Sequence, residues 1–131
     1  MNTLTNFFDE IWCINLDHRT DRWESAQDEF KKIGIENDVK RFSAIENKDG
    51  RVGIIKSVYS LIKSAKEKKL NNILIFEDDI KFLNLDNFHN NLEISINQLP
   101  YDWELFYLGA NLNIKNYLYS SNLVHLKEAF A

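Results

Sequence analysis

Three consecutive carboxylates, Glu77, Asp78 and Asp79, directly follow the apolar run Ile73–Phe76. The run is short, β-branched and aromatic, which predicts a buried strand. Because adjacent carboxylates repel one another, a divalent cation would stabilise them, and Mg²⁺ and Mn²⁺ prefer oxygen ligands that often include substrate phosphates. Residues i and i+2 of an extended segment point the same way, so Glu77 and Asp79 are the expected metal ligands. A solvated acidic turn that caps a helix is the alternative, and the sequence leaves it open.

The turn Asn15–Arg22 (NLDHRTDR) contains Arg19 and Arg22, two of the four arginines in the chain. It joins a predicted strand, Ile11–Leu16, to a predicted helix. The N–H groups of a helix N-terminus and the planar guanidinium group both bind phosphate oxygens well. The turn is therefore a candidate pyrophosphate site, and the alternative is that both arginines form surface salt bridges with neighbouring aspartates.

Strand and helix signals alternate along the chain, which favours an α/β fold with a largely parallel sheet. The first helix is expected to begin at an Asp21 N-cap and to end at Gly34. In the second helix, the residues expected to face inward are Ile54, Val58, Leu61, Ile62 and Ala65, while Lys63, Lys66, Lys68 and Lys69 form a solvated face. The other expected elements are strands Val39–Ile45, Ile73–Phe76 and Trp103–Leu108, helices Gly53–Lys69 and Leu85–Leu99, and one strand or short helix after Asn111.

Length, charge and cysteine content exclude several protein classes. The 131 residues, without a repeat or linker, predict a single domain over 1–131. A net charge of −4 argues against a general nucleic-acid partner. No apolar stretch is long enough to span a bilayer, and the N-terminus lacks the basic segment of a signal peptide. One cysteine excludes a disulfide scaffold. We therefore expect a cytoplasmic protein without a transmembrane segment, although peripheral membrane contact stays open.

Taken alone, ILIFEDDI fits two classes: a phospho-acceptor receiver domain and a nucleotide-sugar enzyme. A receiver domain opens with the strand that carries its acidic pair. Here 72 residues precede Ile73 and 52 follow Asp79, so the receiver interpretation fails on position.

Five segments, in order, resemble glycosyltransferase family 25, which includes lipooligosaccharide and collagen galactosyltransferases. They are INLDHRTDRW, RFSAI, the helix start from Gly53 to Ser57, ILIFEDDI and DWELFYLGAN. The resemblance implies a GT-A-like, Rossmann-like α/β/α sandwich with a mostly parallel central sheet. It also implies metal-dependent, inverting transfer of a hexose such as galactose from a UDP-sugar donor to a glycan or glycosylated acceptor, with Mn²⁺ or Mg²⁺ as the cofactor.

The resemblance also assigns roles to individual residues, without identifying a catalytic base. Asp79, with Glu77, would contact the metal, and Asp78 would bind ribose and water. Arg19 and Arg22 would lie near the diphosphate or order that loop. Gly109, Ala110 and Asn111 would shape the far side of the donor pocket. The remaining donor-site residues implied by the resemblance are Asn15, Leu16, Asp17, Ala44, Ile45 and Ser57.

Two departures from the family pattern stand out. The family motif Gly-Cys-x-x-Ser-His has Ile54 and Val58 at its Cys and His positions here. Family domains also continue beyond the segment NLVHLKEAFA. We therefore expect a donor-binding domain that lacks the C-terminal acceptor part and is poorly active alone. Its apolar tail is expected either to be covered in a homo-oligomer or to be disordered. The alternatives are a non-catalytic module that binds a nucleotide sugar or a partner, and a structural α/β domain whose acidic triplet binds nothing.

Overall fold

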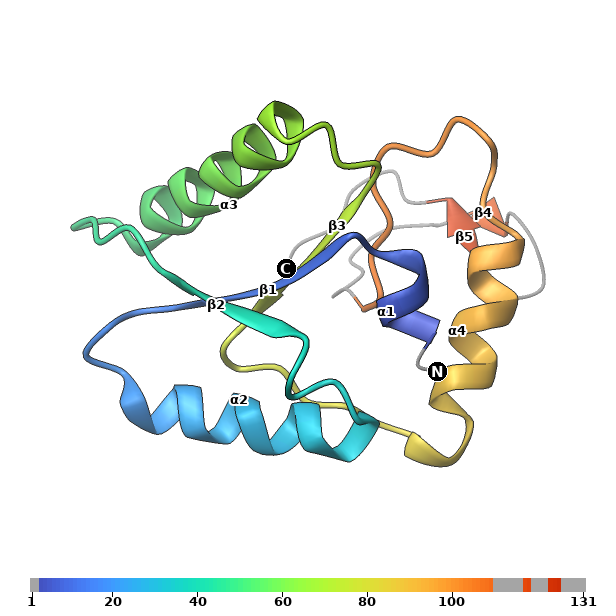
Figure 1. The fold of residues 1–131 in the computed structure, drawn as a ribbon, viewed down its shortest axis with the longest axis horizontal. Coiled ribbons are helices and arrows are strands. Elements are labelled where there is room, and N and C mark those ends of the chain that lie inside the picture. The colour runs from blue at the N-terminus through green and yellow to red at the C-terminus, as the bar shows by residue number, and fades with distance from the viewer. Residues whose placement is uncertain (1–2, 110–116, 119–122, 126–131) are drawn as a thin grey trace. The chain divides into compact units, whose positions relative to one another are not determined.

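Three parallel strands form the sheet of the first of two units, 1–86 and 87–131, into which the computed structural model divides. The structure describes residues 3–109, 117–118 and 123–125. The strand order is β2-β1-β3, and Figure 1 shows α2 and α3 on opposite sides of the sheet. The elements of this unit are α1 (Thr3–Phe7), β1 (Glu10–Asn15), α2 (Thr20–Ile33), β2 (Val39–Ser43), α3 (Gly50–Glu67) and β3 (Ile73–Glu77).

This arrangement confirms the predicted α/β class with a parallel sheet. The central strand β1 pairs with both neighbours, so that Ile14 lies opposite Phe42 on one side and Glu77 on the other. The chain passes from β1 to β2 through α2 and crosses β1 again through α3 to reach β3. The strand order therefore reverses between β1 and β3, and in open α/β sheets ligands bind beyond the carboxyl ends of the strands at such a point.

Helix α2 packs its apolar side against the sheet through Phe30, which is fully buried. The centroid of the Phe30 ring lies 5.4 Å from that of Phe76 in β3. Gly34 ends the helix in the left-handed conformation, with φ of 70°, as predicted. The prediction of an Asp21 N-cap is wrong: Arg19 occupies the N-cap position, and the carboxylate of Asp21 accepts hydrogen bonds from the Arg19 guanidinium instead.

Helix α3 begins three residues earlier than predicted, at Gly50, because Asp49 caps it by accepting a hydrogen bond from the backbone N–H of Arg51. Its buried residues recur every fourth position and face the rest of the unit; they are Gly53, Ser57 and Leu61. Ile62 was expected to face inward, but its side chain is 54% exposed. Ile62 directly follows the buried Leu61, and successive side chains of an α-helix are rotated by about 100°. This rotation turns Ile62 away from the packed side.

The second unit contains α4 (Phe88–Asn97) and an antiparallel pair of two-residue strands, β4 (Tyr117–Leu118) and β5 (Val124–His125). A 3₁₀ turn, η1 (Leu85–Asn87), stands where the predicted helix Leu85–Leu99 should begin. The predicted strand Trp103–Leu108 is wrong, since these residues form no strand in the structure and Leu105 is 71% exposed. An apolar run becomes a strand only when it finds a pairing partner and a face to bury.

Some expectations concern residues that lie outside the described part of the chain, namely Ala110, Asn111 and most of the C-terminal tail. Folding of 1–131 as a single domain stays a prediction. Within the described residues, no helix combines the length and the apolar character needed to cross a bilayer.

Candidate functional site

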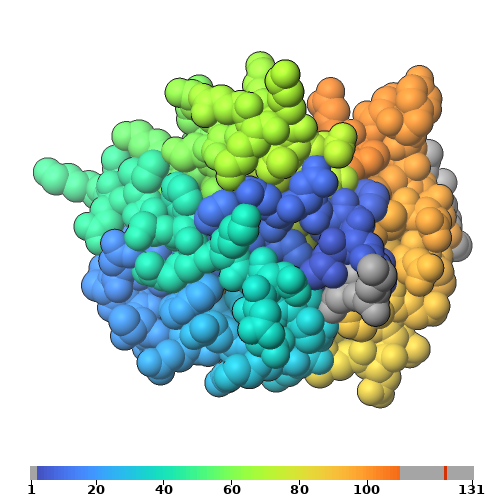
Figure 2. Space-filling view, in the orientation of Figure 1, coloured from blue at the N-terminus to red at the C-terminus, as the bar shows by residue number. Residues whose placement is uncertain are grey.

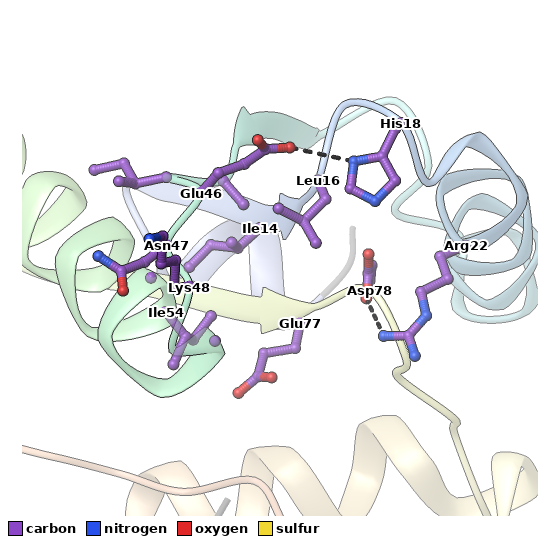
Figure 3. A pocket seen from close by; sticks show the side chains of 14 residues that line it. Ile14, Leu16, His18, Arg22, Glu46, Asn47, Lys48, Ile54, Glu77 and Asp78 are labelled. Atoms are coloured by element: carbon purple, nitrogen blue, oxygen red, sulfur yellow. Dashed lines mark hydrogen bonds and ion pairs between the residues drawn. The ribbon is translucent and has the colours of Figure 1, made fainter.

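A pocket of about 610 Å³ lies in the first unit, beyond the carboxyl ends of its three strands (Figure 3). The loop after β1 forms one wall, the loop between β2 and α3 forms another, and the residues at the end of β3 complete it. The lining residues are Ile14, Leu16, His18, Arg22, Ala44, Ile45, Glu46, Asn47, Lys48, Gly50, Gly53, Ile54, Glu77 and Asp78.

Asp78 is held in place by hydrogen bonds from two segments that are distant in sequence. Asn15 is buried, with 1% of its surface exposed. Its Nδ2 lies 2.6 Å from Oδ2 of Asp78. Nη1 of Arg22, from the first turns of α2, lies 3.2 Å from Oδ1 of the same carboxylate. The side chain of Arg22 remains 45% exposed and lines the pocket. The geometry therefore places a cationic group at the pocket with Asp78 as its anchor.

Asn15 also organises the turn after β1. Its Nδ2 donates a second hydrogen bond, of 3.0 Å, to the backbone carbonyl of Arg19, and its Oδ1 accepts one of 2.9 Å from Nε of Arg41 in β2. A buried amide that satisfies three partners fixes the path of the backbone around it. Asn15 thus positions the pocket-lining turn without lining the pocket itself.

Asp17 and Arg19 lie in the same turn but do not line the pocket. Asp17 accepts hydrogen bonds from Ser43 and from Arg41 in β2, and these bonds hold the pKa of its carboxyl below the usual range. The guanidinium of Arg19 forms a two-pronged ion pair with Asp21, at 2.9 and 2.7 Å. The salt-bridge alternative therefore describes Arg19, whereas Arg22 pairs with Asp78.

The wall formed by Ala44 and Ile45 is fixed to α3 by two small residues. Oγ of Ser57, fully buried, accepts a hydrogen bond of 2.8 Å from the backbone N–H of Ile45 and donates one of 2.9 Å to the carbonyl of Gly53. A Cβ atom at Gly53 would lie 2.6 Å from the carbonyl oxygen of Ile45. The spacing of Gly53 and Ser57 therefore lets the segment that follows β2 approach the helix closely.

The acidic triplet divides between two environments. Asp78 turns towards Arg22, while Figure 3 shows Glu77 pointing away from that pair. Burial, followed by the nearby charges of Asp79 and Asp78, raises the pKa of the Glu77 carboxyl. Asp79 is exposed and does not line the pocket.

The acidic triplet supplies carboxylate oxygens that could ligate a metal ion. In the described part of the chain, no group of three or more His, Cys, Asp or Glu side chains is arranged to hold a metal ion. Glu77 nevertheless brings an oxygen ligand to the pocket. Mg²⁺ and Mn²⁺ often take only one or two carboxylates and complete their coordination with water and substrate phosphate. The ligand atoms present at the pocket therefore suit such an ion only when a phosphate group also coordinates it.

The structure brings together about half of the residues that the sequence assigned to the donor site. Those lining the pocket are Leu16, Arg22, Ala44, Ile45, Glu77 and Asp78, and those outside it are Asn15, Asp17, Arg19, Ser57 and Asp79. Gly109 belongs to the other unit.

Sequence reasoning missed the loop that follows β2, where Glu46, Asn47 and Lys48 line the pocket. Oε1 of Glu46 lies 3.2 Å from Nδ1 of His18, which joins the loops after β1 and β2. The signal that could have found these residues is their position: they follow a predicted strand of a parallel sheet, at the edge where its ligands bind.

A parallel α/β unit with a pocket at the reversal of its strand order is an arrangement that many nucleotide-binding enzymes use. The chain is 28% identical to procollagen galactosyltransferase 1-A of Xenopus laevis over an alignment 133 positions long. The alignment covers 78% of this chain and 21% of that protein, so the chain spans about a fifth of the length of this relative. No family model and no solved structure matches the chain. The similarity supports a distant relationship to a glycosyltransferase, and membership of family 25 stays a prediction.

Proposed function

We propose that the pocket binds a nucleoside-diphosphate sugar and that the chain supplies the donor-binding part of a glycosyltransferase of the family 25 type. The observation that carries the proposal is the placement of Arg22 at the pocket, paired with Asp78 at the point where the strand order reverses. A UDP-hexose such as UDP-galactose is the first donor to test, because the distant relative is a galactosyltransferase.

The two sides of the pocket suit the two halves of such a donor. Ile14, Leu16 and Ile45 provide an apolar wall against which a base can pack. Arg22 offers guanidinium N–H groups beyond the one that contacts Asp78, and planar guanidinium groups bind phosphate oxygens well. Lys48 also lines the pocket, but Figure 3 shows it across the pocket from Arg22, so the proposed diphosphate position rests on Arg22 alone.

A divalent cation, Mn²⁺ or Mg²⁺, completes the proposal. Glu77 would hold it at the pocket, with water and the donor phosphates as further ligands; the structure does not bring Asp79, the other expected ligand, to the pocket lining. When bound, the ion would stabilise the negative charge of the departing diphosphate. Arg22 would bind a phosphate oxygen of the same diphosphate.

For the reaction, we propose transfer of the sugar to a hydroxyl group of a glycan or glycosylated acceptor. The acceptor must be held against the donor carbon with a base within hydrogen-bond reach. His18, Glu46 and Glu77 line the pocket, but nothing in their placement singles out one of them as that base. We expect the chain alone to bind donor better than it turns donor over. Turnover of UDP-galactose by the chain would separate a transferase from a non-catalytic binding module.

Calorimetric titration of the chain with UDP and with uridine, each with and without Mn²⁺, tests the proposal. We expect UDP to bind more tightly than uridine. Mn²⁺ should strengthen the binding of UDP but not the binding of uridine. Arg22→Gln should weaken UDP by roughly tenfold or more, the value of one charge-assisted hydrogen bond.

Arg19→Gln is the matched control for this titration, since Arg19 lies in the same turn but outside the pocket. It should change UDP affinity much less than Arg22→Gln. Equal losses for UDP and uridine in Arg22→Gln would contradict the phosphate role, and no UDP binding at all would refute the proposed function.

A further inference from the structure

Helix α3 has a second apolar stripe, on the side that does not pack against the sheet. Its four members follow one another at intervals of three, four and three residues, which keeps them on one face of a helix. In Figure 2 the side chains of α3, in green, form part of the outer surface of the first unit. The members, with their exposed fractions, are Val52 (37%), Ile55 (66%), Tyr59 (66%) and Ile62 (54%).

This stripe lies directly opposite the packed side of α3. The packed side is marked by Gly53, Ser57 and Leu61, all of them buried. At about 100° per residue, the centre of the exposed stripe falls on the far side of the helix from these three positions. Large apolar side chains in a row on a helix surface mark an interaction site more often than the same residues scattered singly.

Basic side chains lie along one flank of the stripe and at its C-terminal end. At about 100° per residue, Lys56 and Lys63 fall on the same flank, and Lys66 continues the line of the stripe. All three are exposed, and within the described residues no ion pair involves them, although the whole chain has a net charge of −4. A face that is apolar along its centre and positive along one flank is complementary to a surface that has negative groups outside and apolar groups beneath them.

We propose that this face of α3, the stripe with its flanking lysines, docks on the surface of an anionic lipid bilayer. Lysine stems can lie along apolar surface while their ammonium groups reach the lipid phosphates, and tyrosine favours the boundary between apolar and wet regions. Protein interfaces, by contrast, are depleted in lysine, and the basic flank of the stripe carries Lys56 and Lys63. Antiparallel pairing with a second copy of α3 would bring the two lysine flanks together, which is unfavourable.

Docking through this face leaves the pocket open, because α3 lines the pocket from its other side, through Gly50, Gly53 and Ile54. Lipid binding and nucleotide binding are therefore separate properties of the same unit. A variant that loses one should keep the other, and either proposal can fail without the other.

Co-sedimentation of the whole chain with vesicles tests the proposal. One set of vesicles contains phosphatidylcholine alone, and the other contains about a third phosphatidylglycerol. We expect binding to the second set only, weakened by salt, because screening reduces the attraction between lysines and lipid phosphates. Exchange of Ile55 and Ile62 for Gln should lower binding by about tenfold or more, since each loses apolar contact with the acyl region. Exchange of Lys56 and Lys63 for Gln should lower it similarly.

Two control variants lie elsewhere on the surface of the same unit. Leu83→Gln changes another exposed apolar residue, 77% exposed, and Lys31→Gln another exposed lysine, so both should bind vesicles like the original chain. Equal binding to both kinds of vesicle, or equal losses in the controls, would overturn the proposal. So would a dimer that forms without lipid and is lost in Ile55→Gln, which would assign the stripe to a second copy of the chain.

Discussion

Asn15, the last residue of β1, donates a hydrogen bond of 2.6 Å to the carboxylate of Asp78, which follows the last residue of β3. The two residues are 63 positions apart in the sequence and lie in the gap where the strand order reverses. Because the same carboxylate also accepts a hydrogen bond from Arg22, a buried amide and an exposed cation share one anchor. The position of the proposed phosphate-binding group therefore depends on a contact inside the sheet.

Replacement of Asn15 by Leu should lower the free energy of unfolding by at least about 2 kcal/mol. The leucine has a similar volume but removes one hydrogen bond from each of Asp78, Arg41 and the carbonyl of Arg19. Each of the three keeps another partner, namely Arg22, Asp17 and the backbone N–H of Trp23, so the cost is that of the three lost hydrogen bonds. Urea denaturation of both proteins measures the difference. The control is Asn37→Leu, in an exposed turn, which should change the free energy of unfolding by about 0.5 kcal/mol or less. Equal losses in the two variants would mean that the Asn15 network contributes nothing specific.

Ser57→Ala should destabilise the chain by about 1–3 kcal/mol, because the backbone N–H of Ile45 loses its acceptor. Ser60 lies on the same helix and donates the same kind of bond to the carbonyl four residues before it, but it accepts none from another segment. Ser60→Ala should therefore be neutral or slightly stabilising. Thermal unfolding of both variants makes the comparison, and a similar effect at both positions would contradict the account of the Ile45 wall.

Gly53→Ala should both destabilise the chain and weaken UDP binding. The new Cβ would lie 2.6 Å from the carbonyl oxygen of Ile45, so that the segment that follows β2 must move away from α3. At Gly50 a Cβ would meet no atom within 4 Å, and Gly50→Ala should be neutral or stabilising because alanine favours the helix. Thermal unfolding of both variants, with calorimetry of Gly53→Ala, tests this prediction. If Gly53→Ala is as stable as Gly50→Ala, the close approach is not tight.

Glu29, 3% exposed on α2, should make stability depend on pH. A hydrogen bond from Lys32, joined by the backbone N–H of Phe82 and by Lys81, lowers the pKa of its carboxyl from 4.5 to about 2. A folded-state pKa below the unfolded value contributes stability that is complete above pH 4.5 and is lost as the pH falls towards 2.

Glu29→Gln should therefore cost about 2 kcal/mol near neutral pH, and the difference from the original chain should shrink as the pH falls through this range. Denaturation at several pH values tests the trend. The control is Glu24→Gln, an exposed change on the same helix, which should show no such trend. If the difference in unfolding free energy between Glu29→Gln and the original chain stays constant as the pH falls through this range, the charge of Glu29 does not have this role.

The strands of the sheet were predictable from local patterns, and each starts and ends within two residues of its predicted bounds. Val39–Ile45 alternates apolar and polar residues, and Ile73–Phe76 is a short apolar run. The run Trp103–Leu108 has the same composition and forms no strand, because pairing depends on a partner that composition does not reveal.

The candidate site was predictable at the level of strand ends and not at the level of contacts. Sequence position placed Arg22 and Asp78 at the same edge of the sheet, but nothing local indicates that they pair with each other while Arg19 pairs with Asp21. The helix cap failed for the same reason, since Asp21 has a competing partner in Arg19. Contacts between distant segments depend on the packed geometry, which a local pattern does not contain.

Titration of the isotope-labelled chain with UDP, followed by backbone amide chemical shifts, tests the central claim most directly. The account predicts shifts that saturate and that concentrate at Leu16, Arg22, Ala44, Ile45 and Asp78, with Mn²⁺ broadening the signals around Glu77. It also predicts that Arg22→Gln removes most of the response to UDP and little of the response to uridine. Saturating shifts that map to another part of the chain, or no shifts at millimolar UDP concentrations, would contradict the assignment of this pocket to a nucleotide-sugar donor.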